Sequence, residues 1–155
     1  MGTIGFSYIG AIFLILLFIP NILWTRALPA GYDASNESKI LLVLERVGEV
    51  SVSVCAVIFT DFNIKEWTAW SWWFVAACFF MVLYELWWIG YFRSERTLKD
   101  FYSSMLGIPV GGATPPVLAF LCLGIYGKVI WMIIAVIVLG IGHIGIHLEH
   151  RRTIE

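Results

Sequence analysis

Three histidines lie on one stripe near the end of the chain, in the stretch LGIGHIGIHLEHRR at positions 139–152. His143, His147 and His150 are four and then three residues apart, so a helix would place their imidazoles along one face. Imidazoles with this spacing could bind a metal ion, transfer protons or hydrogen-bond to a ligand. They could also simply suit the C-terminus of a helix, where positive charge is stabilised. The spacing alone leaves these alternatives open, with the metal site the weakest.

Carboxylates occur in two other apolar stretches. ILLVLERVGEV contains Glu45, Arg46 and Glu49, and MVLYELWW contains Glu85 beside Tyr84. Arg46 and Glu49 have the i, i+3 spacing of an ion pair, which accounts for one carboxylate. Glu45 and Glu85 are costly in lipid unless they are paired, protonated or hydrated, and ionisable groups inside a membrane mark functional sites by default.

The composition around these residues is that of an integral membrane protein. Of 155 residues, 60% are hydrophobic and 14% are charged, whereas a soluble domain has about 25% charged residues. The length allows one helical bundle, so we expect a single domain over 1–155 in the cell membrane. Ten basic and eleven acidic residues give no basic patch, and no nucleic-acid motif is present. Three cysteines are too far apart for a zinc or redox motif: Cys55, Cys78 and Cys122.

Five segments have the roughly 20 mostly apolar residues that a transmembrane helix needs. They cover about 4–24, 40–60, 68–92, 106–126 and 129–148. The last two are divided at GIYGK, because one span over 117–141 would bury Lys128 near the bilayer centre at a cost of about 3 kcal/mol or more.

The loop charges predict an N-terminus outside and a C-terminus in the cytoplasm. With that orientation, seven basic residues lie on the cytoplasmic side and two on the outer side, as the positive-inside rule requires. The seven are Arg26, Lys39, Arg93, Arg96, Lys99, Arg151 and Arg152, and the two are Lys65 and Lys128. Tryptophans 67, 70, 72, 73 and 131 would then form an outer aromatic belt.

The longest inner loop, FRSERTLKDFYSSML, contains a short apolar stripe. Leu98, Phe101, Tyr102 and Met105 are spaced i, i+3, i+4 and i+7. This spacing predicts a short amphipathic helix on the membrane surface between the third and fourth spans.

The ionisable groups fall at similar depths. With 1.5 Å of rise per residue, Glu45 and Glu49 lie about 9 and 15 Å from the cytoplasmic end of the second span, Glu85 about 12 Å and His143 about 9 Å. We expect His150, beyond the last span, in the headgroups or in water. Three helices therefore bring polar groups into the cytoplasmic half of the membrane.

The other two spans are irregular in the same half. IPNILW combines Pro20, which removes a helical hydrogen bond, with the amide of Asn21, and GIPVGGATPPVL is rich in proline and glycine. Irregular backbone at membrane depth is tolerated where protein buries it or where it lines a wet cavity. We therefore expect a polar cavity open to the cytoplasm and closed toward the outside. The glycines of GIGHIG predict close helix packing.

The stretches ILLVLERVGE, GIPVGGATPPVLAF, GIYGK and GIGHIGIHLEH resemble a family of small uncharacterised bacterial membrane proteins. In its five spans, size and tryptophan content the chain is also similar to the translocator protein family of tryptophan-rich sensory proteins. That resemblance is architectural and implies a helical bundle that binds lipophilic ligands. It carries no residue roles to this chain.

Our first hypothesis is that the bundle binds or transports a small amphiphilic or cationic ligand, because carboxylates outnumber the single arginine. The candidate site residues are Asn21, Glu45, Arg46, Glu49, Tyr84, Glu85, His143 and His147. One alternative is a membrane-embedded enzyme, metal-dependent or not, that uses His143 and His147 with a carboxylate. Another is a structural or partner subunit whose polar groups hold helices together. A through-pore channel is least favoured because the outer half has no polar lining. The cofactors and the oligomeric state, including a homo-oligomer, stay open.

Overall fold

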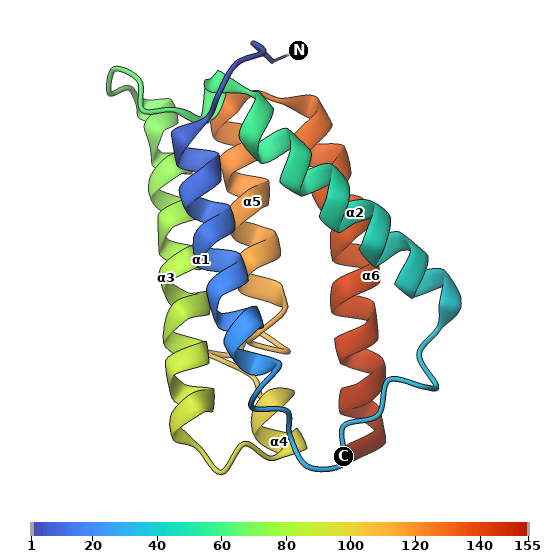
Figure 1. Ribbon diagram of the computed structural model, residues 1–155. Helices are drawn as coiled ribbons and strands as arrows, with labels where there is room; N and C mark the ends of the chain where they lie inside the picture. The colour runs from blue at the N-terminus through green and yellow to red at the C-terminus, as the bar shows by residue number, and fades with distance from the viewer. Residues whose placement is uncertain (1, 155) are drawn as a thin grey trace.

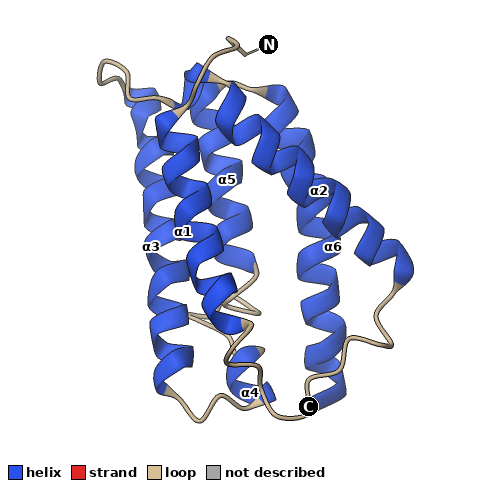
Figure 2. Cartoon of the chain, in the orientation of Figure 1, coloured by secondary structure: helices blue, strands red, loops and turns tan. Residues whose placement is uncertain are grey.

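A computed structural model describes residues 2–154, and they form an all-helical protein (Figures 1 and 2), which confirms the all-α part of the expected fold class. Five long helices make up the bundle: α1 Tyr8–Trp24, α2 Lys39–Ile58, α3 Trp72–Arg93, α5 Thr114–Gly127 and α6 Ile130–Ile154. Three short helices lie in the connections: η1 Thr60–Phe62, η2 Ala69–Ser71 and α4 Leu98–Phe101. In Figure 1 the chain starts at one end of the bundle and α6 finishes at the other, which we call the C-terminal end.

Within residues 2–154, two helical stretches are long and apolar enough to cross a membrane, Ala69–Arg93 and Ile130–Ile154. α1 and α5 are apolar but shorter. These helices give the membrane location coarse support. Several large aromatic side chains are exposed around the ends where α3 and α6 begin: Trp67, Trp70, Trp72, Trp73 and Trp131.

α5 differs from the fourth expected span, because it begins at Thr114 and not near residue 106. Pro115 and Pro116 occupy its first turn, where proline is tolerated because the first backbone N–H groups of a helix have no intrahelical acceptor. The preceding stretch is not helical and places Val110 at a φ of 44°. At the other end, the GIYGK turn separates α5 from α6 as expected. Lys128 adopts a φ of 56° there, and its N–H bonds back to Gly124.

α2 and α6 cross in close contact, and glycines make the approach possible. A Cβ atom on Gly142 would lie 2.3 Å from the backbone nitrogen of Glu45, and one on Gly48 would lie 2.4 Å from the Cα atom of Leu139. Distances this short allow no side chain larger than hydrogen. The predicted packing role is confirmed for Gly142, and the contact places Glu45 opposite His143.

The expected amphipathic helix is only one turn long, from Leu98 to Phe101, with a capping box from Thr97. Phe101 and Tyr102 are buried. Phe101 stacks on Trp24 with the ring centroids 5.0 Å apart. The apolar stripe therefore packs largely into the bundle, with Phe101 and Tyr102 in its core and Leu98 and Met105 partly buried against it.

Candidate functional site: a two-lobed cavity

A cavity of about 270 Å³ lies near the C-terminal end of the bundle, between α1, α2, α3, α6 and the 25–38 loop. We call it the polar cavity. Its polar lining comprises Asn21, Tyr32, Glu37, Glu45, Arg46, Glu49, Tyr102, His143 and His147. The sequence placed six of these in one slab: Asn21, Glu45, Arg46, Glu49, His143 and His147. The structure brings all six to one cavity.

A second cavity of about 270 Å³ adjoins the first and extends deeper into the bundle. We call it the apolar cavity, because its lining is dominated by Leu17, Phe18, Val52, Val117, Phe120 and Leu139. Five residues border both cavities: Asn21, Trp24, Glu49, Gly112 and His143. The two lobes therefore lie side by side and share part of their lining.

Glu45 and His143 form the central pair of the polar cavity. The Oε1 atom of Glu45 lies 2.6 Å from Nδ1 of His143, and these side chains are 13% and 24% exposed. A carboxylate bonded to one imidazole nitrogen fixes the tautomer and the ring orientation. The close crossing at Gly142 determines this distance, because it holds the backbones of α2 and α6 together.

His147 continues the imidazole stripe on α6. Its ring centroid lies 4.7 Å from that of His143, and its other neighbours are the rings of Phe101 and Tyr102. The buried Nδ1 atom of His147 has no hydrogen-bond partner. Buried polar atoms are usually paired, so this nitrogen is available to a ligand or a water molecule.

Arg46 and Glu49 form the ion pair that their spacing predicted, with Nη1 and Oε2 2.9 Å apart. Their side chains are 73% and 43% exposed, although both line the polar cavity. The pair therefore lies at the edge of the cavity, where the cavity meets the surface of the bundle.

Tyr84 and Asn21 join α3 to α1. The Nδ2 amide of Asn21 donates to the carbonyl oxygen of Leu17 at 2.7 Å and to the Tyr84 hydroxyl at 2.8 Å. The Tyr84 hydroxyl in turn donates to the Leu17 carbonyl at 3.0 Å. Tyr84 lines the apolar cavity and not the polar one. Its hydroxyl therefore adds one polar contact to a mostly apolar wall.

Glu85 is not among the residues that line either cavity, which corrects the expectation from its depth. Adjacent helical residues point about 100° apart, so Tyr84 faces the cavity and Glu85 faces elsewhere. The Oε1 atom of Glu85 is buried without a hydrogen-bond partner.

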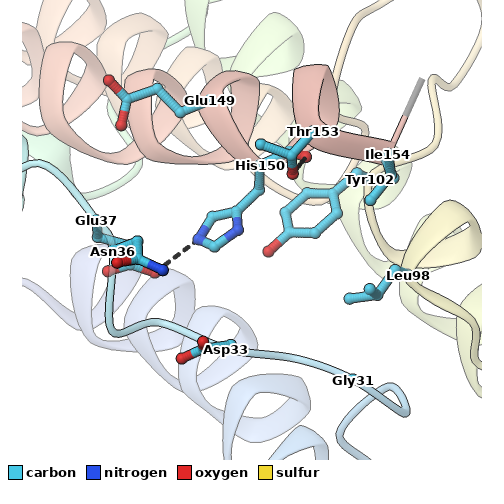
Figure 3. Close-up of a pocket in the computed structure, with 10 residues that line it drawn as sticks. All are labelled: Gly31, Asp33, Asn36, Glu37, Leu98, Tyr102, Glu149, His150, Thr153 and Ile154. Atoms are coloured by element: carbon cyan, nitrogen blue, oxygen red, sulfur yellow. Dashed lines mark hydrogen bonds and ion pairs between the residues drawn. The ribbon is translucent and has the colours of Figure 1, made fainter.

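His150 is more enclosed by protein than its position beyond the last span suggested. Its Nε2 atom lies 2.9 Å from Oε1 of Glu37, and the two side chains are only 19% and 8% exposed. The His150 ring stacks on Tyr102 at 5.3 Å and on Tyr32 at 6.0 Å. Figure 3 shows the Glu37 contact and the Tyr102 ring beside His150. The 25–38 loop supplies both Tyr32 and Glu37 and thereby shields the histidine.

Sequence reasoning missed Tyr32, Glu37 and the aromatic wall of Trp24, Phe101 and Tyr102. The loop residues have no periodic pattern, so nothing in the sequence indicated that they fold back over α6. Burial raises the pKa of Tyr102 above its usual value, and that of Tyr32 is raised by burial and by Glu37. Both hydroxyls therefore remain protonated at neutral pH.

The described residues do not support a metal centre. Within residues 2–154 no three histidine, cysteine or carboxylate side chains are grouped closely enough to hold a metal ion. His143 and His150 each bond to a different glutamate, so the three imidazoles do not converge on one point. The arrangement suits hydrogen bonding and proton transfer better than metal coordination.

No protein-family model, curated protein or solved structure matches this chain.

Proposed function

We propose that this chain is a multi-pass membrane protein that binds or transports a small amphiphile with a cationic head. In the proposal α1, α2, α3, α5 and α6 cross the cell membrane, with the N-terminus outside and the C-terminal end of the bundle in the cytoplasm. The head lies in the polar cavity, and the tail lies in the apolar cavity.

The observation that carries the proposal is that the two cavities lie side by side and share five lining residues. Ligand sites are concave and mostly apolar, with a few convergent polar groups that fix orientation. Here the polar groups converge at one end, around Glu45 and His143, and the rest of the space is lined by aliphatic and aromatic side chains. A molecule with one polar end and one apolar end matches this division.

Charge supports a cationic head. Three carboxylates line the polar cavity, those of Glu37, Glu45 and Glu49, against the single guanidinium of Arg46. Glu37 is thus the third carboxylate of the cavity, a position expected from the sequence for Glu85. Aromatic rings in the wall, including Trp88, add favourable surface for a cation, because the face of an aromatic ring attracts positive charge.

The test is saturable binding of radiolabelled octyltrimethylammonium to the protein in phosphatidylcholine nanodiscs, with empty nanodiscs as the blank. We expect Glu45→Gln to weaken binding about tenfold, in line with losing a charged contact in a partly buried site. Glu85→Gln is the matched control, because it removes a carboxylate that lines neither cavity. The proposal fails if wild-type protein shows no saturable binding, or if both variants weaken it equally.

A second candidate is an enzyme that uses Glu45 and His143 as a general acid and base. Their separation of 2.6 Å favours it, because a carboxylate bonded to an imidazole is a common arrangement for proton transfer. Mass spectrometry of a bacterial lipid extract incubated with the protein would detect products that appear with wild-type protein and disappear with Glu45→Gln. If no lipid species changes, the enzyme is excluded for these substrates and the binding function remains as the proposal.

A further inference from the structure

The lining of the two-lobed cavity comes near the protein surface in two places, at the C-terminal end of the bundle and at its side, and we call these the end approach and the side approach. At the end lies a separate surface pocket of about 290 Å³, drawn in Figure 3. We call it the outer pocket because it lies at the protein surface, and the name does not refer to the outer side of the membrane. It shares Glu37 and Tyr102 with the polar cavity. These two side chains lie between the outer pocket and the polar cavity, and we call them, together with His150, the partition.

Contacts on both sides of the partition hold its side chains together. Glu37 bonds to His150 at 2.9 Å, and the His150 ring stacks on Tyr102. Behind them Tyr32 packs edge-on against Trp24 at 5.3 Å and against Phe101 at 6.3 Å. A loop, α4 and the last turns of α6 thus meet in one aromatic layer. A solute from the water at this end would have to displace it.

The side approach lies between α1 and α2. α2 packs closely on α6 through Gly48 and Gly142, and in Figure 1 it leans away from α1 toward its own N-terminus. Phe18 of α1 is exposed at the surface and also lines the apolar cavity. Arg46 of α2 is exposed and also lines the polar cavity. The same side chains therefore border both the cavity and the outer surface.

We infer that the cavity is filled sideways from the lipid leaflet, between α1 and α2, by an amphiphile already dissolved in the bilayer. The Glu37–His150 pair holds the 25–38 loop closed against water at the C-terminal end. This inference rests on the proposed membrane location and ligand class. It narrows that class to amphiphiles that partition into lipid, since in the proposed orientation the surface between α1 and α2 faces the leaflet and the loop closes the C-terminal end.

A reporter cysteine in the cavity separates the two approaches. In a background with Cys55, Cys78 and Cys122 replaced by alanine, Asn21→Cys borders both lobes, and Ser53→Cys in the apolar cavity is the alternative if the first variant does not fold. The protein in phosphatidylcholine nanodiscs is treated with N-dodecylmaleimide, which partitions into lipid, or with trimethylammonioethyl methanethiosulfonate, which stays in water. We expect the lipid-soluble reagent to label the reporter at least about tenfold faster, relative to each reagent's rate with free cysteine.

Releasing the loop should then admit the water-soluble reagent. His150→Phe keeps the ring stacking and removes the hydrogen bond, and Glu37→Ala removes its partner. Loss of one charge-assisted hydrogen bond corresponds to about a tenfold faster reaction with the water-soluble reagent. The two substitutions together should add little, because they break one interaction. Glu149→Ala is the matched control: Glu149 lines the outer pocket, and its carboxylate points away from His150 in Figure 3.

Four results would overturn the inference. The first is faster labelling of the reporter cysteine by the water-soluble reagent than by the lipid-soluble one while the loop is wild-type. The second is an unchanged rate of labelling by the water-soluble reagent in both loop variants, and the third is the same increase in Glu149→Ala. The fourth uses a chain that keeps only Cys122, which is buried in α5 and reports general loosening: if the loop variants expose this thiol too, closure by the loop is disproved. None of these rates depends on octyltrimethylammonium binding, so a failed binding function is recognised separately.

Discussion

Two glutamate–histidine pairs in this molecule have the same chemistry but different supports. Glu45 and His143 come from α2 and α6, whose backbones touch at Gly142, so neither residue can move without its helix. Glu37 and His150 join a loop to the end of α6, and only the loop has to move to separate them. The comparison indicates that the first pair is a fixed part of the binding wall and the second is a closure. Substitutions in the two pairs, at the helix crossing and at nearby residues test that difference.

The largest effect is expected from Gly142→Ala. The new methyl group would overlap the backbone of Glu45, so α2 and α6 must separate, and we expect a loss of about 2–4 kcal/mol in unfolding free energy together with loss of ligand binding. Denaturant unfolding followed by tryptophan fluorescence measures it. Gly90→Ala is the control, because nothing lies within 4 Å of its added Cβ, and it should be neutral or stabilising by up to about 1 kcal/mol. Equal destabilisation by both would contradict a close crossing at Gly142.

Next in size is the difference between His143→Phe and His150→Phe. The first leaves the Glu45 carboxylate unpaired in a rigid wall, and we expect it to cost about 1–3 kcal/mol. The second leaves Glu37 unpaired too, but the loop can carry that carboxylate into water, so we expect about half that loss. The same unfolding measurement compares them. A larger loss in His150→Phe would mean that the loop, and not the helix crossing, holds this end together.

A smaller effect of opposite sign is expected for Glu85→Gln. One carboxylate oxygen of Glu85 is buried without a partner, and a neutral amide costs less to bury than an unpaired charge. Thermal unfolding in detergent should show a gain of up to about 1 kcal/mol, with unchanged affinity for octyltrimethylammonium. A clear loss of stability would reveal a partner for this side chain.

The smallest effect concerns Tyr102→Phe at high pH. Burial raises the pKa of Tyr102 in the folded protein, so above about pH 10 the unfolded chain releases this proton while the folded chain retains it. That difference lowers stability as the pH rises through and beyond the unfolded pKa, and it is absent below about pH 9. The phenylalanine variant should therefore lose less stability than wild-type protein between pH 9 and pH 11, measured by thermal unfolding. Parallel profiles would show that the hydroxyl is solvated.

The sequence predicted the helices and the depth of the polar groups along the bundle better than it predicted the directions of the side chains. Apolar length located the helices, and GIYGK marked the turn between α5 and α6, because charge and glycine are local signals. Depth follows from residue counting, which is why six of the eight candidate residues line the polar cavity and Tyr84 lines its neighbour. The rotation of α3 depends on packing, so Glu85 could not be distinguished from Tyr84.

The closure could not be predicted for a different reason. Tyr32 and Glu37 lie in a connection without periodicity, and His150 lies beyond the last apolar turn, where a position in water was the simplest expectation. Their association depends on the path of the 25–38 loop across the end of α6. The stripe of Leu98, Phe101, Tyr102 and Met105 was visible, but a stripe does not indicate whether lipid or protein covers it.

The shortness of α5 also decides which helices lipid could touch. Its 14 residues span about 21 Å, whereas the hydrocarbon layer of a bilayer is about 30 Å thick. Most of its side chains are buried, because α3 and α6 pack against it. In the proposed membrane location α5 would therefore be an inner helix, and the longer helices α3 and α6 would form the surface that has to match the thickness of the bilayer.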